Sequence, residues 1–365
     1  LLISCGDAKQ LPPISGRPIW ACVNMCTLME IFVFRADVRA VDPNLQWIND
    51  QCRRQLNEAE CSVAADVIMA NCRFVDSWDD VPDVAVRIVG TRSAEIKVMD
   101  EFIAGRQTTD FVAEDEVQNV MEWEPANVRI TARLNANCYE YDVCKLYVNA
   151  IVRMTYNDRN ARTPFSQGQI AVVVELPDVN VEFRNKQLRL RLAPPGVRNI
   201  DVDNIPHDWP EILIRPRTTQ PTIVGKFFQK GRRTQFPVRF YLTSTIHRIQ
   251  GQTLGLVATE LNDLKREYRL WQKEQFAVLI SRVQQCNDII FVGLRADTRS
   301  AIERVLLGSS KYDLIIDNYL EVLDVSRRPQ HVREIDQILH PFLPIYQELP
   351  TASCGFVYLL VSVRE

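Results

Sequence analysis

The sequence is poor in histidine and has no CxxC pair, which argues against the commonest small structural sites. It contains 4 His and 10 Cys, and the closest cysteine spacings, Cys22/Cys26 and Cys138/Cys144, have no histidine beside them. A zinc site and a disulfide framework are therefore both disfavoured. The simpler interpretation is a protein of a reducing, intracellular compartment.

The sequence also lacks a large excess of charge and any long apolar run. Its formal net charge is -3 and its pI is near 6.0, so a nucleic-acid partner must be argued from local patches. No run approaches the ~18 apolar residues of a membrane span, so no membrane partner is expected. The first residue is Leu1 rather than Met, and we expect the chain to be part of a longer protein. Its length of 365 residues, with 46% hydrophobic and 24% charged content, indicates two or three soluble domains.

Apolar runs that end in polar loops alternate with helical patterns, which predicts an α/β fold. Strands are expected at residues 1–5, 31–34, 84–90 and 289–294, and helices at 43–56, 93–102, 268–283, 301–307 and 312–325. The first strand is interpreted as a buried, parallel one. Between residues 146 and 221 the pattern changes to short apolar pieces and polar turns, with six prolines between 194 and 221, and residues 188–192 alternate strictly. This middle part is predicted to be a small β-rich domain inserted in an α/β domain.

Polar residues crowd the stretch 242–254, which follows a strand-like segment. Its hydroxyl-bearing start suggests the cap of a helix, and Gly251 is suited to end one. The stretch also holds Thr245, His247, Arg248 and Gln250. Such crowding at a strand end is typical of a functional site in an α/β sheet.

Three further residues are candidates whose interpretation from the sequence alone stays open. Gln10 lies in a loop stiffened by Pro12 and its neighbour, where its amide would hold a phosphate oxygen or serve no ligand at all. Arg39 follows a strand and would clamp a phosphate, although a plain surface arginine is the simpler interpretation. Arg282 ends a helical pattern, where it would either complement the helix dipole or reach a transferred phosphoryl group.

The most basic and aromatic segment lies between residues 226 and 239. Its members are Lys226, Lys230, Arg232, Arg233 and Arg239, with Phe227, Phe228 and Phe236 among them. Basic side chains bind a phosphate backbone and aromatic faces stack on unpaired bases, which suits single-stranded nucleic acid. A solvated loop is an equally good interpretation of this composition.

Taken in order, these pieces resemble the RecD-like branch of superfamily-one DNA helicases, and most closely the Pif-type family. Gly6-Asp-Ala-Lys-Gln-Leu-Pro-Pro13 resembles the third helicase motif, and Arg39 stands where the fourth-motif arginine is expected. Residues 146–157 with Gly168 resemble the entry to an inserted small barrel. Residues 245–253 and 275–283 resemble the fifth and sixth motifs. The resemblance covers about residues 1–295.

This resemblance implies a motor that binds ATP and Mg²⁺ between two RecA-like domains and moves 5′ to 3′ on single-stranded DNA. The family works in DNA repair, recombination and telomere maintenance, which implies the nucleus for a eukaryotic source. Single-stranded DNA and DNA junctions are the implied partners, and a monomer is expected. Catalysis would fall to Gln10, Arg39 and Arg282, which with Gly6, Asp7, Gln250 and Gly251 would bind the nucleotide. The DNA-binding set would be Pro12, Thr245, His247, Arg248, Lys230, Arg232 and Arg233.

The same resemblance divides the chain into domains. Residues 1–75 would be the remainder of a first, truncated RecA-like domain, bounded by an acidic loop at 73–83. Residues 84–160 and 236–300 would form the second RecA-like domain, with 161–235 as the inserted β-rich domain. Residues 301–354 would be a helical extension and linker. Residues 354–364 resemble the first strand of a GIY-YIG nuclease domain, for which a plain buried strand is the alternative.

The sequence departs from the family pattern in two respects. Arg248 replaces the usual lysine and Ile249 a smaller residue, while Ala277 and Leu279 change the packing expected behind Arg282. No Gly-x-x-x-x-Gly-Lys-Ser/Thr occurs, and the metal-binding Asp-Glu pair would lie upstream of Gly6. We therefore expect this fragment to be inactive alone. The alternative is a non-catalytic single-stranded DNA-binding or regulatory module derived from a helicase.

Overall fold

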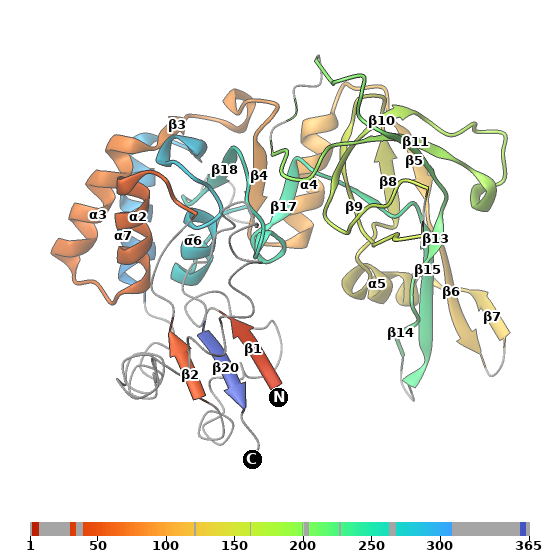
Figure 1. Ribbon diagram of the computed structural model, residues 1–365, viewed down its shortest axis with the longest axis horizontal. Helices are drawn as coiled ribbons and strands as arrows, with labels where there is room; N and C mark the ends of the chain where they lie inside the picture. Colours follow the sequence, from red (N-terminus) through yellow and green to blue (C-terminus); the bar gives the residue numbers. More distant parts are fainter. Residues whose placement is uncertain are drawn as a thin grey trace. The chain divides into compact units, whose positions relative to one another are not determined.

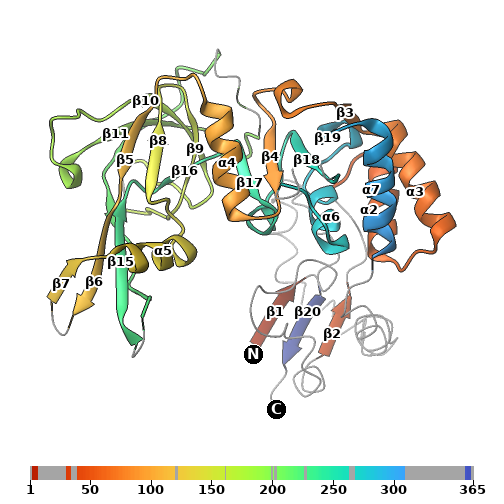
Figure 2. The ribbon, with the colours of Figure 1, turned by 180° about the vertical axis from the view of Figure 1, so that it is seen from behind.

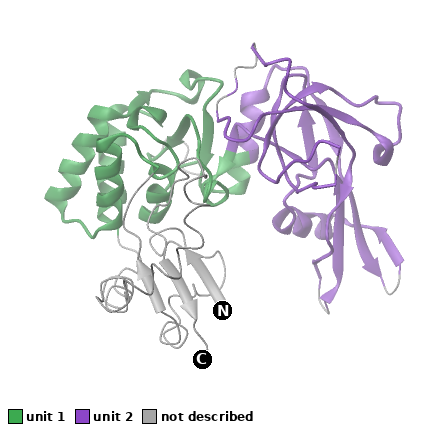
Figure 3. Ribbon diagram, viewed as in Figure 1, with its two compact units in different colours: residues 1–95, 244–365 green, residues 96–243 purple. Residues whose placement is uncertain are grey.

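The chain forms two compact units in a computed structural model (Figure 3). The structure describes residues 39–308 except 120–121, 161, 199, 201–203, 226–227 and 263–267, together with the backbone of strands at 2–6, 30–33 and 358–362. Unit 1 comprises residues 1–95 and 244–365, and unit 2 comprises residues 96–243.

A five-stranded sheet is the centre of unit 1. Its strands are β3 (Arg73–Val75), β4 (Val86–Val89), β17 (Thr243–Thr245), β18 (Val257–Glu260) and β19 (Ile289–Val292), in the order β17-β4-β18-β19-β3 (Figure 1). The pairings of β18 with β4, of β18 with β19 and of β19 with β3 are parallel. Strands β4, β18 and β19 are buried along their whole length, as expected of a parallel sheet covered on both faces. The predicted α/β class is confirmed.

Four helices of unit 1 pack against one another: α2 (Pro43–Arg53), α3 (Glu58–Asn71), α6 (Lys273–Ile280) and α7 (Arg295–Leu307) (Figures 1 and 2). Helix α2 begins where the sequence predicts it, because Asp42 accepts a hydrogen bond from the Asn44 N–H and Pro43 occupies the first helical position. Helix α3 begins with a reciprocal capping box between Asn57 and Glu60.

The acidic loop expected to end the first domain lies inside unit 1. Strand β3, within that predicted boundary, pairs with β19, and α3 packs against α7. Residues 43–75 therefore belong to the same sheet-and-helix body as β4 and β18 rather than to a separate first domain.

Unit 2 is built mainly from antiparallel strands. One sheet has the order β12-β11-β10-β9-β16, formed by β9 (Ile151–Met154), β10 (Ile170–Glu175), β11 (Leu188–Leu192), β12 (Glu211–Ile214) and β16 (Val238–Phe240). A second joins β6 (Glu114–Asn119), β7 (Glu122–Pro125), β13 (Arg217–Thr218), β14 (Thr222–Ile223) and β15 (Lys230–Gln235). Strands β5 (Thr109–Val112) and β8 (Val143–Leu146) pair separately. The alternation predicted for β11 is confirmed, since its first, third and fifth residues are buried.

Helices α4 (Arg92–Ile103) and α5 (Val128–Asn137) complete the described helical elements of unit 2, with α4 shared between the units. Helix α5 packs Ile130 and Leu134 against Val117 of β6 and Val224. The inserted body is larger than the predicted 161–235, because strands β5 to β9 and helix α5 precede residue 161 and belong to it.

Three terminal strands form a small sheet of their own: β1 (Leu2–Gly6), β20 (Tyr358–Ser362) and β2 (Glu30–Val33). Strand β20 lies between the other two and pairs antiparallel with both, so β1 is not in the parallel pairing predicted for it. The GIY-YIG domain stays a prediction, as does the helix at 312–325, which lies outside the described residues. None of the described helices is long and apolar enough to cross a membrane.

Candidate functional site

The polar stretch 242–254 contains less helix than predicted. Residues Thr243–Thr245 form β17, and only a single 3-10 turn, η5 (Ile246–Ile249), follows. Ile246 and Ile249 are fully buried, because residues three apart lie on the same side of such a turn. The Thr245 side chain makes no capping hydrogen bond, so the predicted helix cap does not form. Gly251 has a φ of 78°, which fits its predicted role of ending the turn.

Of the candidate DNA-binding residues in this stretch, Thr245 is buried and His247 and Arg248 are partly exposed. Arg248 donates from one terminal nitrogen to Glu95 Oε2 at 2.9 Å, and its carbonyl accepts from Gln252 Nε2 at 2.7 Å. His247 is half-buried, and this burial lowers the pKa of its imidazole. The imidazole is therefore neutral at pH 7 and acts as a hydrogen-bonding group rather than a cation.

Arg39 is buried against the segment that follows α6. Its guanidinium donates to the Ser281 carbonyl, and the backbone N–H groups of Val41 and Asp42 both donate to the Gln284 carbonyl, at 3.0 and 3.4 Å. Asp42 also accepts from the Cys286 N–H at 3.0 Å. The fourth-motif and sixth-motif segments are thus joined, although 242 positions separate Arg39 from Ser281.

Arg282 meets the same serine from the other direction. Its guanidinium donates to Ser281 Oγ at 2.7 Å, to the Val278 carbonyl at 3.0 Å and to the Gln252 carbonyl at 3.4 Å. The Leu254 N–H in turn donates to the Arg282 carbonyl at 2.8 Å. Only 2% of Arg282 is exposed, so its charge is held by groups of the protein itself. Two arginines and the loop after Gly251 therefore converge on Ser281.

Helix α6 carries Arg282 to this point and is shorter than predicted. Gln275 is fully buried, and its Oε1 accepts from the N–H groups of Trp271 and Gln272 at 2.9 and 3.3 Å, which fixes the start of the helix. Ala277 and Leu279 are buried, and their carbonyls accept from Ser281 and Arg282 at 3.1 and 2.9 Å. The departures from the family pattern thus leave the helix end that positions Arg282 in place.

In unit 2 the basic segment is a strand, β15, and its side chains differ in exposure. Lys230 is exposed. Arg232 is half-buried, bonds Glu116 Oε2 at 2.7 Å and lies 4.1 Å over the Trp123 ring. Of the three basic residues of β15, Lys230 and Arg232 therefore keep exposed surface that a phosphate backbone can reach.

Arg233 does not fit the DNA-binding role predicted for it. It has no exposed surface, and its guanidinium holds both oxygens of Asp115 at 2.7 Å, Asn135 Oδ1 at 2.6 Å and the Glu140 carbonyl at 3.0 Å. Burial lowers the pKa of this guanidinium, but the hydrogen bond and charge of Asp115 outweigh burial and raise it. A buried, bidentate arginine supports packing and contacts no phosphate.

The third-motif residues lie at the edge of what the structure describes. Gly6 ends β1 as backbone, and Asp7, Gln10 and Pro12 lie outside the described residues. The sequence pattern places Ser281 on the predicted helix 268–283 without giving it a role, and nothing singles out Gln252 or Gln284, yet all three are bonded to the two arginine segments. Ser281 precedes Arg282, and its small hydroxyl beside a charged residue is the one signal that pointed to it.

Arg39 and Arg282 are both almost fully buried, so neither guanidinium presents much surface to a ligand in this structure. Arg39 and Arg282 meet at Ser281 and supply guanidinium groups of the kind that bind phosphate oxygens. Among the described residues no group of three or more His, Cys, Asp and Glu side chains is arranged to hold a metal ion.

Comparison with known proteins gives a match at the level of structure. No protein-family model and no curated protein sequence matches the chain. A solved structure of two coordinating Pif1 helicases that unwind forked double-stranded DNA is similar, with a TM-score of 0.50, 15% identity and coverage of 78% of this chain and 53% of that one. Pif1 helicase from Candida albicans matches with a TM-score of 0.53, 16% identity and coverage of 78% and 59%. The chain thus has the fold of the matching part of Pif1 helicases, and it spans between half and three-fifths of their length.

Proposed function

We propose that this chain is the C-terminal part of an ATP-dependent DNA helicase of the Pif1 type. The observation that carries the proposal is the meeting of Arg39 and Arg282 at Ser281, with the loop after Gly251 bonded to Arg282. Phosphoryl transfer needs positive charge placed around the transferred group, and two converging guanidiniums provide it. The shared fold with Pif1 helicases supports the same conclusion.

In this proposal the residues divide between nucleotide and DNA. Arg39 and Arg282 contact the phosphates of ATP together with Gln10, while ATP supplies the phosphoryl group and Mg²⁺ is held by residues of the longer protein. Thr245, His247 and Arg248 face single-stranded DNA. Lys230 and Arg232 add a second, basic contact surface in unit 2.

The bond between Arg282 and the Gln252 carbonyl offers a route for coupling. At 3.4 Å it is longer than the bonds from Arg282 to the Val278 carbonyl and to Ser281 Oγ. A guanidinium that turns toward a phosphate gives up this bond first, which releases the loop that continues the η5 turn. Nucleotide binding then changes the position of Gln250 and Gly251, and through them the DNA-binding residues of the same stretch.

The test is ATP hydrolysis by a protein made from a coding sequence extended upstream of Leu1. We expect hydrolysis that is stimulated by single-stranded DNA and falls about 10³-fold or more in kcat on Arg282→Ala, the range known for arginine fingers. Arg39→Ala should act in the same direction. Arg304→Ala, an exposed arginine on α7, is the matched control and should leave kcat unchanged. Hydrolysis that is indifferent to both substitutions would contradict the proposal.

The direction of movement is a separate part of the proposal. Partial duplexes with either a 5′ or a 3′ single-stranded tail distinguish the two directions. The extended protein should unwind only the 5′-tailed duplex. Unwinding of the 3′-tailed duplex alone would reject the direction and keep the helicase.

A second candidate function is a non-catalytic module that binds single-stranded DNA. It is favoured by the almost complete burial of Arg282, whose charge is bonded to carbonyl groups of the chain. We propose that the 365-residue chain alone hydrolyses no ATP under either function, so the extended protein decides. The non-catalytic module is supported if oligo(dT) binding depends on salt and is retained in Arg282→Ala, and if the extended protein hydrolyses no ATP. Hydrolysis that is lost on Arg282→Ala excludes it.

A further inference from the structure

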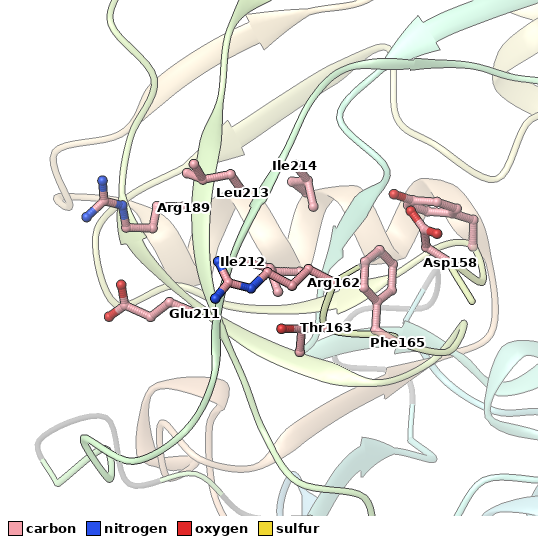
Figure 4. Close-up of a pocket in the computed structure, with 10 residues that line it drawn as sticks. Asp158, Arg162, Thr163, Phe165, Arg189, Glu211, Ile212, Leu213 and Ile214 are labelled. Carbon is pink, nitrogen blue, oxygen red and sulfur yellow. The ribbon is translucent and has the colours of Figure 1, made fainter. Parts of the chain in front are cut away.

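A cavity of about 370 Å³ lies in unit 2 beside strand β12 (Figure 4). The residues that line it belong to a different unit and a different part of the sequence from Arg39 and Arg282. All four residues of β12 line one wall. The loop between Asp158 and Phe165, which are joined by an antiparallel bridge, lines the other wall with Arg162 and Thr163. The cavity is therefore a groove that runs along one strand.

Strand β12 is the edge of its sheet, because it pairs only with β11. The Leu192 N–H donates to the Pro210 carbonyl, so these two residues form a hydrogen-bonded pair. In an antiparallel ladder every second residue along each strand forms such a pair with the neighbouring strand. Ile212 and Ile214 therefore direct their backbone groups to β11, and Glu211 and Leu213 direct theirs outward. Among the described residues, no backbone hydrogen bond to Glu211 or Leu213 closes this edge. An open edge is a template for another strand.

The side chains beside this edge are apolar. Phe165 and Ile214 are buried, Ile212 is half-buried, and Leu213 is 57% exposed. Strand β12 has a charge at its first residue, Glu211, and prolines at 210 and 216 outside its ends, but its centre presents an exposed leucine between two isoleucines. This composition suits a partner that buries an apolar side chain here.

Two arginines and two carboxylates line the groove, and one of the carboxylates, Asp158, accepts a hydrogen bond from the Asn160 N–H at 3.1 Å. Glu211 is bonded to Arg191 at 2.6 Å, and Arg189 is bonded to Glu175 at 3.3 Å. Arg162 is exposed and lines the groove, and no described residue forms an ion pair or hydrogen bond with its side chain. The groove thus offers one positive charge without an internal counter-ion, opposite the apolar edge.

We propose that β12 and Arg162 form a docking site for an extended, acidic segment of a partner protein. The segment adds to the sheet as an antiparallel or parallel neighbour of β12 and bonds the outward groups of Glu211 and Leu213. One of its apolar side chains enters the cavity against Phe165, and a carboxylate pairs with Arg162. This is strand addition, in which main-chain bonds give affinity and side-chain pockets give selectivity.

The geometry favours a peptide over nucleic acid at this groove. A peptide backbone supplies donors and acceptors in alternation and so satisfies both the N–H and the C=O groups of the edge. A phosphate backbone supplies acceptors only, and would leave the outward carbonyls unpaired.

The experiment is selection of peptides from a phage-displayed random 12-residue library on the 365-residue chain, followed by Kd measurement on synthetic peptides by fluorescence anisotropy. We expect enriched peptides that alternate apolar and polar residues and carry Asp or Glu near the apolar position. Arg162→Glu should raise Kd at least tenfold, and Arg159→Glu, an exposed arginine of the same loop that does not line the groove, should not. Leu213→Pro removes an outward N–H without touching the β11 ladder and should also raise Kd at least tenfold. Leu213→Thr keeps that N–H and should change Kd less.

Four outcomes overturn the proposal. The first is that no peptide is enriched, and the second is that the Arg162→Glu and Leu213→Pro chains bind the peptide as tightly as the unsubstituted chain. The third is displacement of the peptide by oligo(dT), and the fourth is self-association of the chain that Leu213→Pro abolishes. The third would assign the groove to nucleic acid, and the fourth to a second copy. Circular dichroism of each variant establishes that the fold is retained. Arg162→Gln, the milder change, replaces Arg162→Glu if the latter fails to fold.

Discussion

Replacement of Arg233 by methionine separates the packing role of this residue from the DNA-binding role that its sequence context suggests. Methionine keeps an unbranched chain of similar length and removes only the guanidinium. The Asp115 side chain is 7% exposed, so Arg233→Met leaves a buried carboxylate without its counter-ion. Asn135 and the Glu140 carbonyl lose their donor as well. Unit 2 should therefore lose stability while no DNA-facing surface changes.

The magnitude follows from the geometry of the pair. Removal of one partner of a buried, bidentate ion pair costs about 3–5 kcal/mol. A domain is stable by only about 5–15 kcal/mol, so Arg233→Met removes about a fifth of that stability or more. The double variant Arg233→Met/Asp115→Leu has no buried charge and should recover most of the loss, since an apolar pair of similar volume is often as stable as the ion pair. The double-mutant cycle isolates the coupling between the two residues.

Hydrogen exchange measured on peptides from β15 and α5 gives the opening free energy of unit 2 without interference from unit 1. Binding of oligo(dT) across a series of salt concentrations supplies the second readout. Lys230→Ala, an exposed change on the same strand, is the matched control: it should leave stability within about 0.5 kcal/mol. If Lys230 contacts a phosphate, its loss should reduce the salt slope by about 0.7. A folded Arg233→Met chain of unchanged stability and weakened DNA binding would refute the packing role.

Three further substitutions test local features of unit 1. Burial lowers the pKa of His247 below 6.5, so the unfolded chain binds the proton more readily than the folded chain. The contribution of His247 to stability is therefore complete above pH 6.5 and decreases as the pH drops toward the folded pKa. The variant His247→Asn should flatten that part of a plot of urea midpoint against pH. Gly251→Ala should lower the free energy of unfolding in urea by about 1 kcal/mol. The cost comes from backbone strain alone, because φ is 78° and an added Cβ would meet no atom within 4 Å. An unchanged free energy of unfolding would show that the turn relaxes. Asp42→Ala should cost about 1–2 kcal/mol as a lost helix cap. Burial raises the pKa of Asp42, but hydrogen bonds from Cys286 and Asn44 outweigh burial and lower the pKa. The stabilisation by the Asp42 cap is therefore present at neutral pH and lost as the pH falls through the folded pKa. If Asp42→Ala still destabilised the protein in acid, this explanation would be wrong.

Those elements whose signals are local could be predicted from the sequence. The start of α2 follows from Asp42 before Pro43, and the alternation of β11 shows in its residues. The sixth-motif segment was also identified, although α6 is shorter than its pattern. In each case the information lies within a few residues, where capping chemistry and periodicity act.

Features that depend on distant partners could not be predicted. Strand β3 has only three residues and borders an acidic loop, so nothing local indicates that it pairs with β19 rather than ending a domain. Arg232 and Arg233 look alike in the sequence, and each bonds a carboxylate of β6 more than 110 positions away. What separates them is burial, because adjacent residues of a strand point to opposite faces and only Arg233 is fully buried. The hydroxyls of residues 243–245 resemble a helix cap but lie in β17, because the neighbouring β4 decides their conformation.

The strand order of unit 1 has a consequence for synthesis of the chain on the ribosome. Strands β3 and β4 are made first, yet β18 and β19 lie between them in the sheet, and β17, the other neighbour of β4, is made only after all of residues 90–242. Both early strands are therefore without their sheet partners while unit 2 emerges and folds. Closure of unit 2 brings residues 96 and 243 into one compact body, which shortens the effective loop that β17 must close to reach β4. Strand β4 has both of its sheet neighbours once residue 260 has been made, whereas β3 gains its partner β19 only at residue 292.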